Sequence, residues 1–141
     1  MRSREFISED EDYRGVHRSP GPENGAPLYD LTGIYPDDVY SSKAAQYYGH
    51  FGGNHPLDVE SIRKIHALRG KPKQGVQIYR AVPKTVTQIN PGDWVTINKN
   101  YAKDHGESAL EGNYRIISKI VNAKDLYTDG NSIHEFGYYP T

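Results

Sequence analysis

The sequence predicts an α+β domain: a small split antiparallel β-sheet with about three short helices, preceded by a flexible N-terminal arm. A length of 141 residues fits one domain, so we expect an arm over 1–25 and a single domain over 26–141. Short runs that alternate apolar and polar side chains indicate strands. The 14 glycines and 9 prolines that separate these runs indicate a chain rich in turns.

Four runs have the alternation and the β-branched content of strands. The run from Asn113 to Val121 is the strongest of them, and the run after Asn90-Pro91-Gly92 begins at a turn signal. Asp129-Gly130 predicts a turn that reverses the chain into the last strand. The predicted strands are 76–82, 94–97, 114–121 and 133–138.

The predicted helices begin at capping residues and end at glycines. Asp58 is the expected N-cap of the clearest helix, which Gly70 ends and whose apolar residues fall near one face. Gly49 and Gly106 end the other two. The predicted helices are 41–48, 59–69 and 99–105, and we expect 123–128 to form a turn or a single helical turn.

The first 25 residues have the composition of a flexible arm. They contain the charged run 8–12 and a Ser-Pro-Gly-Pro segment, and neither can bury much apolar surface. The exception is 13–18, which has the pattern of a short strand. The following segment, 26–40, interrupts its apolar residues with glycine and proline, so we expect an ordered loop that packs.

The composition excludes several classes of function. A net charge of -1 gives no basic field for a tight grip on long nucleic acid, and the absence of cysteine excludes disulfides and thiolate metal sites. We expect no metal, because the 6 histidines lack the spacing of known ligand motifs. No apolar run approaches the roughly 20 residues that a membrane helix needs, so we expect a cytoplasmic protein without a membrane partner.

Three residues in the predicted strands are candidates for chemistry. Glu135 lies within an otherwise apolar and aromatic strand, where a carboxylate is costly unless it is paired. Arg80 lies in the first strand beside Tyr79, and Thr96 lies in the second. His134 precedes Glu135, and because successive strand residues face opposite ways, the two are not expected to share a site.

The order of these motifs resembles the arginine, serine-threonine-serine and glutamate series of the ADP-ribosyltransferase fold. The resemblance is closest to the small domains encoded by phages and attached to phage head-morphogenesis proteins, and it covers about 27–139. The segments that carry it are 78–83, with Arg80; 90–96, with Trp94 and Thr96, followed by Tyr101 and His105; and 130–135, with Glu135. Because the interval from Arg80 to Thr96 is short for the family, Arg14 is the alternative for the first motif position.

The resemblance implies chemistry on NAD as a substrate, in which the bond between nicotinamide and ribose breaks and ADP-ribose passes to a host protein or nucleic acid. Arg80 would contact the pyrophosphate or ribose with its guanidinium. Thr96 would hold the glutamate or the ribose, and Glu135 would stabilise the positive charge that develops at the anomeric carbon. The ligand-binding set also includes aromatic and imidazole side chains, of which Tyr101 or Trp94 would stack on nicotinamide: Tyr79, Trp94, Tyr101 and His105.

Two alternatives remain open. The first is a phage-encoded binding or inhibitor protein that keeps the fold without turnover, with an arm that folds on its partner. The second is a small metal-independent ribonuclease with His105, Glu135 and Arg80 as base, acid and phosphate clamp. For His105 there is also a non-catalytic interpretation, in which the imidazole interacts with the end of its helix.

Overall fold

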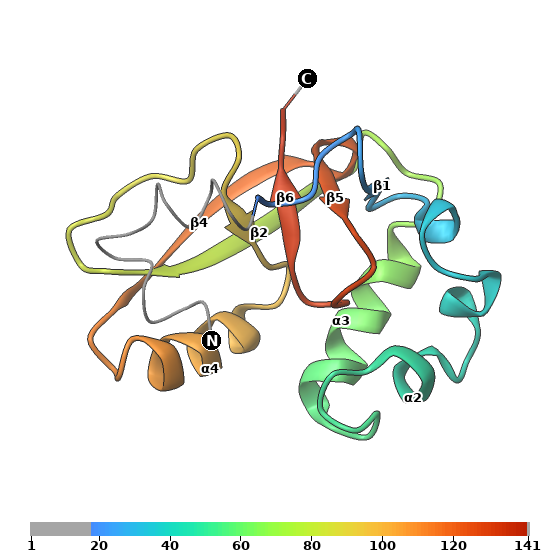
Figure 1. Ribbon diagram of the computed structural model, residues 1–141, viewed down its shortest axis with the longest axis horizontal. Helices are drawn as coiled ribbons and strands as arrows, with labels where there is room; N and C mark the ends of the chain where they lie inside the picture. The colour runs from blue at the N-terminus through green and yellow to red at the C-terminus, as the bar shows by residue number, and fades with distance from the viewer. Residues whose placement is uncertain (1–17, 141) are drawn as a thin grey trace.

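The computed structural model describes residues 18–140, which form an α+β domain with two antiparallel sheets (Figure 1). The fold class predicted from the sequence is therefore confirmed. One sheet has four strands in the order β1-β5-β6-β3, and the other pairs β2 with β4. The strands are β1 (Ala26–Pro27), β2 (Gly75–Val82), β3 (Trp94–Val95), β4 (Arg115–Asn122), β5 (Leu126–Thr128) and β6 (Phe136–Tyr138).

The two sheets meet where β3 ends. Val95 pairs with Phe136 of β6, and the next residue, Thr96, instead forms an isolated bridge with Tyr79 of β2. The strand predicted over 94–97 is thus shorter than expected, because the chain changes partner between Val95 and Thr96. This crossing brings the middle of β2 close to the start of β6.

Two other parts of the strand prediction differ from the structure. The segment 123–128 contains the expected helical turn, a 3-10 helix at Ala123–Asp125, but it continues directly into β5. The strand expected over 133–138 begins only at Phe136, because the residues before it turn their polar groups inward. The long strands β2 and β4 lie within one residue of their predicted bounds and pair along their whole length.

The helices are α2 (Ala44–Tyr48), α3 (Pro56–Ala67) and α4 (Lys99–Ala109). Helix α3 begins earlier than predicted: its N-cap is His55, whose Nδ1 accepts a hydrogen bond from the backbone N–H of Leu57, and Asp58 lies in the first turn. Helix α4 continues past Gly106, which was expected to end it. Gly106 instead allows close packing, since a Cβ there would lie 2.4 Å from the ring of Tyr114.

The buried face of α3 is only partly apolar. The residues of this helix that are buried are Leu57, Asp58, Ser61, Ile62 and Ile65. Val59, which the predicted apolar face included, is 41% exposed. Two polar side chains therefore occupy positions on the helix that the periodicity alone would give to the core, and they contribute to the site described below.

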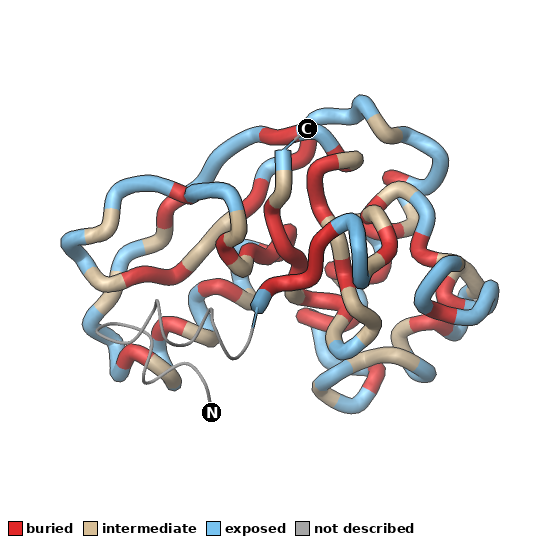
Figure 2. Tube along the Cα trace, turned by 45° about the horizontal axis from the view of Figure 1, so that its top comes forward, coloured by how far each residue is buried: buried red, intermediate tan, exposed pale blue. Residues whose placement is uncertain are grey.

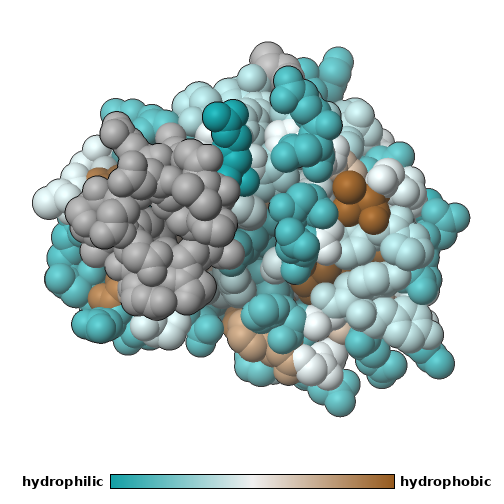
Figure 3. Space-filling model, in the orientation of Figure 1, coloured by the Kyte–Doolittle hydropathy of each residue, from teal (hydrophilic) through white to brown (hydrophobic). Residues whose placement is uncertain are grey.

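The core lies where the two sheets and α3 meet, and burial is concentrated there in the Cα trace (Figure 2). The largest fully buried apolar side chains are Leu28, Leu31, Ile65, Ile78, Ile97, Leu126, Ile133 and Phe136. The described surface in Figure 3 is mostly hydrophilic, with small apolar patches. Within residues 18–140, no helix is long and apolar enough to cross a membrane.

Part of the predicted arm packs against the domain. Ser19 is 2% exposed; its Oγ donates to the carbonyl of Gly92 at 2.7 Å, and its carbonyl accepts from the hydroxyl of Tyr139 at 3.1 Å. The packed chain thus already includes residues assigned from sequence to the arm. Residues 13–17 of the strand-like segment, Arg14 among them, lie outside the described residues.

Replacing Gly137 with alanine is expected to lower the free energy of unfolding by about 1–3 kcal/mol, the usual range for overpacking. A Cβ at Gly137 in β6 would lie 2.0 Å from the carbonyl oxygen of Pro20, a backbone atom that cannot rotate away. Urea denaturation measures the loss. The matched control is Gly75→Ala in β2, where the nearest atom is the side-chain Cγ2 of Ile120 at 3.4 Å; equal losses in the two variants would contradict this packing.

Candidate functional site

Arg80 and Trp94 lie beside one another on neighbouring strands. The Nε of Arg80 donates to the carbonyl of Trp94 at 3.2 Å, so the side chain of Arg80 extends from β2 toward β3. Tyr79 pairs with Thr96 through two backbone hydrogen bonds of 2.8 and 2.9 Å. Four of the predicted site residues therefore lie next to one another where the two sheets meet: Tyr79, Arg80, Trp94 and Thr96.

Thr96 lies one residue beyond the pairing of β3 with β6. Trp94 pairs with Gly137 and Val95 with Phe136; the pairing ends there, with Thr96 bridging Tyr79 and Glu135 standing just before β6. Thr96 is 4% exposed, and its Oγ1 accepts a hydrogen bond from the backbone N–H of Asn98 at 3.1 Å. The hydroxyl expected to serve a ligand thus also fixes the start of α4.

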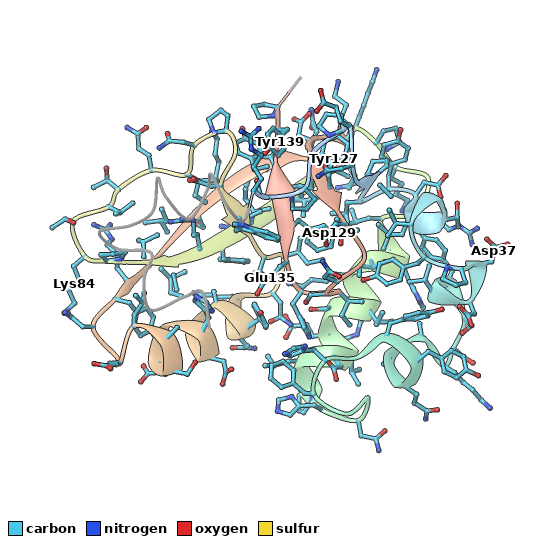
Figure 4. All side chains as sticks on the ribbon, in the orientation of Figure 1. Asp37, Lys84, Tyr127, Asp129, Glu135 and Tyr139 are labelled. Atoms are coloured by element: carbon cyan, nitrogen blue, oxygen red, sulfur yellow. The ribbon has the colours of Figure 1, made fainter. Side chains whose placement is uncertain are left out.

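Glu135 lies at the beginning of β6, between α3 and α4 (Figure 4). Its carboxylate accepts a hydrogen bond from the hydroxyl of Tyr101, a residue in the first turn of α4. The side chain of Glu135 is half-buried. The structure therefore joins Tyr101 and Glu135 directly, through the hydroxyl of Tyr101.

The ring of Tyr101 stacks on the imidazole of His134. The ring centroids are 4.6 Å apart and the planes are 9° from parallel. One face of Tyr101 is therefore occupied by the protein. The stacking on nicotinamide proposed from the sequence would have to use the other face.

His134 is completely buried and is held at both ring nitrogens. Its Nε2 is 2.8 Å from Oδ1 of Asp58, and its Nδ1 is 2.7 Å from Oγ of Ser61. A carboxylate can only accept, so Nε2 carries a proton and donates to Asp58, while the hydroxyl of Ser61 donates to Nδ1. The imidazole is neutral in this arrangement.

The carboxylate of Asp58 accepts four hydrogen bonds in all. Besides His134, the donors are backbone N–H groups of the glycine-rich loop before α3: those of His50 and Phe51 at 2.9 Å and that of Gly53 at 3.0 Å. Gly53 has a φ of +88°, a conformation that a side chain would strain. Asp58 thus fixes both this loop and His134 from one buried position.

The pKa values of Asp58 and His134 are both lowered from their ordinary values. Burial raises the pKa of the Asp58 carboxyl, but the hydrogen bonds from Gly53, His134, Phe51 and His50 outweigh it, and the net pKa is lowered. Burial lowers the pKa of His134 and exceeds the opposing effect of Asp58. A charged Asp58 and a neutral His134 agree with the proton positions inferred from the contacts.

This network also fixes the start of α4. The side chain of Asn98 caps the helix by accepting from the backbone N–H of Tyr101 at 3.1 Å. Its amide nitrogen donates to Oγ of Ser61 at 3.0 Å and to the carbonyl of Leu57 at 3.1 Å. The backbone and the ring of Tyr101 are therefore both attached to the polar face of α3.

Asp58, His134 and Ser61 include the residue types of a hydrolase triad, but the arrangement cannot act as a nucleophile. The hydroxyl of Ser61 is completely buried, donates to His134 and accepts from Asn98. A catalytic serine must reach a substrate carbonyl. We assign the three residues a structural role.

The loop before α3 places an aromatic side chain near Tyr101. Phe51 lies 6.3 Å from the Tyr101 ring and 5.5 Å from that of His134, between the imidazoles of His50 and His55 at 4.9 Å. Aromatic rings so arranged form one wall beside the Tyr101–Glu135 pair.

His105 lies one turn after Tyr101, on the same side of α4. It was expected to close the helix, but α4 continues to Ala109. His105 is thus interior to the helix, and the helix-end interaction proposed for it is wrong. It is half-exposed.

Sequence reasoning missed the polar face of α3 and the role of Asn98. The available signal was the spacing of Asp58 and Ser61 with Ile62 and Ile65, which places two polar residues within an apolar stripe. His134 was considered only for whether it could share a site with Glu135. The structure shows that Tyr101 contacts both residues, the ring of His134 and the carboxylate of Glu135.

Other features of the described chain carry less chemistry. Among residues 18–140, no group of three or more histidine or acidic side chains is arranged to hold a metal ion. A surface hollow of about 550 Å³ beside β1 shares no residue with the candidate site. Its carboxylate at Asp30 already accepts from the backbone N–H and the hydroxyl of Thr32.

We expect the protein to lose stability as the pH falls below about 6.5, the ordinary pKa of the histidine ring. Because the folded pKa of His134 is lowered, the unfolded chain binds more protons, so the free energy of unfolding falls through this window. Asp58 adds a second loss of the same sign below its ordinary pKa of 3.8. Urea unfolding at pH 7.5 and 5.5 measures the loss of stability due to His134. In His134→Gln the free energy of unfolding should depend less steeply on pH over this range. A stability that rises on acidification would contradict the neutral imidazole.

Comparison with protein-family models, with curated proteins and with solved structures found no match to this chain.

Proposed function

We propose that this protein is an ADP-ribosyltransferase-like enzyme of phage or mobile-element origin that uses NAD and transfers ADP-ribose to a host protein or nucleic acid. The observation that supports it best is the meeting of three strands. Arg80 of β2, Thr96 at the end of β3 and Glu135 before β6 come from adjacent, paired backbone segments in the order that the family resemblance implies.

Each residue has a physical role in this reaction. The guanidinium of Arg80 binds the pyrophosphate or a ribose hydroxyl, and its Nε donates to the carbonyl of Trp94, which directs the side chain toward β3. The carboxylate of Glu135 stabilises the oxocarbenium-like charge at the anomeric carbon. Thr96, which follows β3 and bridges Tyr79 of β2, keeps the backbone of this region in place through Asn98.

The bond that breaks joins nicotinamide to the ribose, and its electron pair leaves with the neutral nicotinamide. A nucleophile on the acceptor, or water, then forms the new bond to the anomeric carbon and releases a proton. Because Glu135 develops no covalent bond, its contribution is electrostatic. The half-buried position of the carboxylate favours such a role, since screening by water is reduced there.

The wild-type protein tests the proposal directly. Incubation with NAD labelled in the adenylate group, alone and with host lysate, is expected to release nicotinamide and to leave label on a macromolecule. NAD is also expected to raise the melting temperature. Absence of release, of transfer and of any thermal shift would exclude this function and leave the non-catalytic binding protein as the better interpretation.

A further inference from the structure

Tyr101 lies where the buried polar network meets the proposed functional carboxylate. Its ring is parallel to that of His134 and its hydroxyl donates to Glu135. His134 and Glu135 are consecutive in the chain. Tyr101 therefore links them, because its ring packs on the buried imidazole of His134 while its hydroxyl holds the carboxylate of Glu135.

The ring of His134 has little freedom to rotate. Contacts at 2.8 Å to Asp58 and 2.7 Å to Ser61 hold both nitrogens, and the carboxylate of Asp58 is itself held by the N–H groups of the loop before α3. Flipping the imidazole would place carbon atoms against a buried carboxylate and a buried hydroxyl. The plane on which Tyr101 stacks is thus set by α3.

The backbone of Tyr101 is held by the same helix. Asn98 accepts from the Tyr101 N–H, and its amide nitrogen donates to Ser61 and to the carbonyl of Leu57. Fixing the backbone and the ring plane together leaves one position for the phenolic oxygen. A donor fixed in this way loses little side-chain entropy when it binds a carboxylate.

We propose that Tyr101 is a positioning residue for Glu135, held in place by Asp58, Ser61 and His134. The inference rests on the proposed function, in that Glu135 is taken as the functional carboxylate. Tyr101 orients the carboxylate through one of its oxygens and favours its ionised form. The assignment replaces the nicotinamide-stacking role that the sequence suggested for Tyr101.

The test compares Tyr101→Phe, which keeps the ring and its stacking, with Tyr47→Phe, which removes the hydroxyl of a tyrosine that is 56% exposed. The first readout needs no turnover: the carboxyl carbon of Glu135, identified by its loss in Glu135→Gln, is titrated by NMR. In Tyr101→Phe its midpoint is expected to move up by about one pH unit, because a hydrogen bond to the charged form has been lost. Tyr47→Phe should leave the midpoint unchanged.

The second readout is NAD turnover. Tyr101→Phe is expected to lower kcat about 10- to 100-fold, with a change in KM of less than about threefold, as for a group that orients a catalytic carboxylate. An unchanged titration of Glu135 in Tyr101→Phe overturns the positioning role even if turnover falls. A shifted midpoint in a protein that does not turn over NAD supports the positioning role and overturns the proposed function.

Discussion

Replacing Asp58 with alanine is expected to lower the free energy of unfolding by about 3–5 kcal/mol, because four hydrogen-bond donors lose their shared charged acceptor at once. The substitution leaves the N–H groups of His50, Phe51 and Gly53 without their acceptor. It also removes the partner of Nε2 of His134, a fully buried ring. Each buried polar group that loses its partner costs about 1–3 kcal/mol unless water reaches it.

Urea denaturation followed by circular dichroism at pH 7.5 measures this loss. The matched control is Asp37→Ala: Asp37 also lies in the first turn of a helical segment but is exposed, so we expect a change below about 1 kcal/mol. Asp58→Asn should fall between the two, because an amide oxygen still accepts while its NH2 group faces other donors. A loss in Asp58→Ala no greater than in Asp37→Ala would show that the carboxylate does not hold the loop and His134 together.

The strands and helices that the sequence predicts well are those in which local pattern and tertiary position agree. Apolar and polar residues alternate in the first half of β2, β4 is rich in β-branched residues, and the two strands pair from end to end. The run of α3 is likewise amphipathic, which is why its existence was predicted although its first residue was not. For these elements the information is local.

The parts that could not be predicted depend on partners distant in the chain. Strand β3 ends at Val95 because Thr96 pairs with Tyr79, a choice set by the arrangement of the two sheets. Strand β5 has three residues and is stable only between β1 and β6. Gly106 has the sequence character of a helix end, yet it lies within α4 because the ring of Tyr114 packs over it.

The candidate site likewise contains residues that the sequence indicated and residues that it did not. The resemblance indicated Arg80, Thr96 and Glu135, and the structure brings their backbone segments into adjacent, paired strands. The resemblance did not indicate Asp58 or Ser61. A buried polar residue on a helix is recognised only by its partner, and His134 is 73 residues from Ser61 in the chain. The contact between Tyr101 and Glu135 spans 34 residues and has no local signal either.

Replacing Glu135 with glutamine is expected to lower kcat for cleavage of NAD about 100- to 1000-fold while leaving the fold intact. An amide has nearly the same shape as a carboxylate, and it can still accept from the hydroxyl of Tyr101, so the change removes mainly the negative charge. Loss of one preorganised group that stabilises transition-state charge typically costs a factor of this size. In NAD the positive charge lies on the nicotinamide ring and moves onto the ribose as the bond breaks, so losing a carboxylate beside the anomeric carbon should lower kcat far more than it weakens substrate binding.

Release of nicotinamide under saturating NAD measures kcat, and the thermal shift on adding NAD measures binding independently. The control is Glu23→Gln, an exposed glutamate beside the surface hollow, which should keep full turnover. If Glu135→Gln cleaves NAD as fast as the wild type, the charge at this position does not act on the transition state. If Glu135→Gln instead weakens NAD binding while kcat stays the same, the carboxylate holds a ribose hydroxyl in the ground state, because an interaction present before and during the reaction changes affinity without changing kcat.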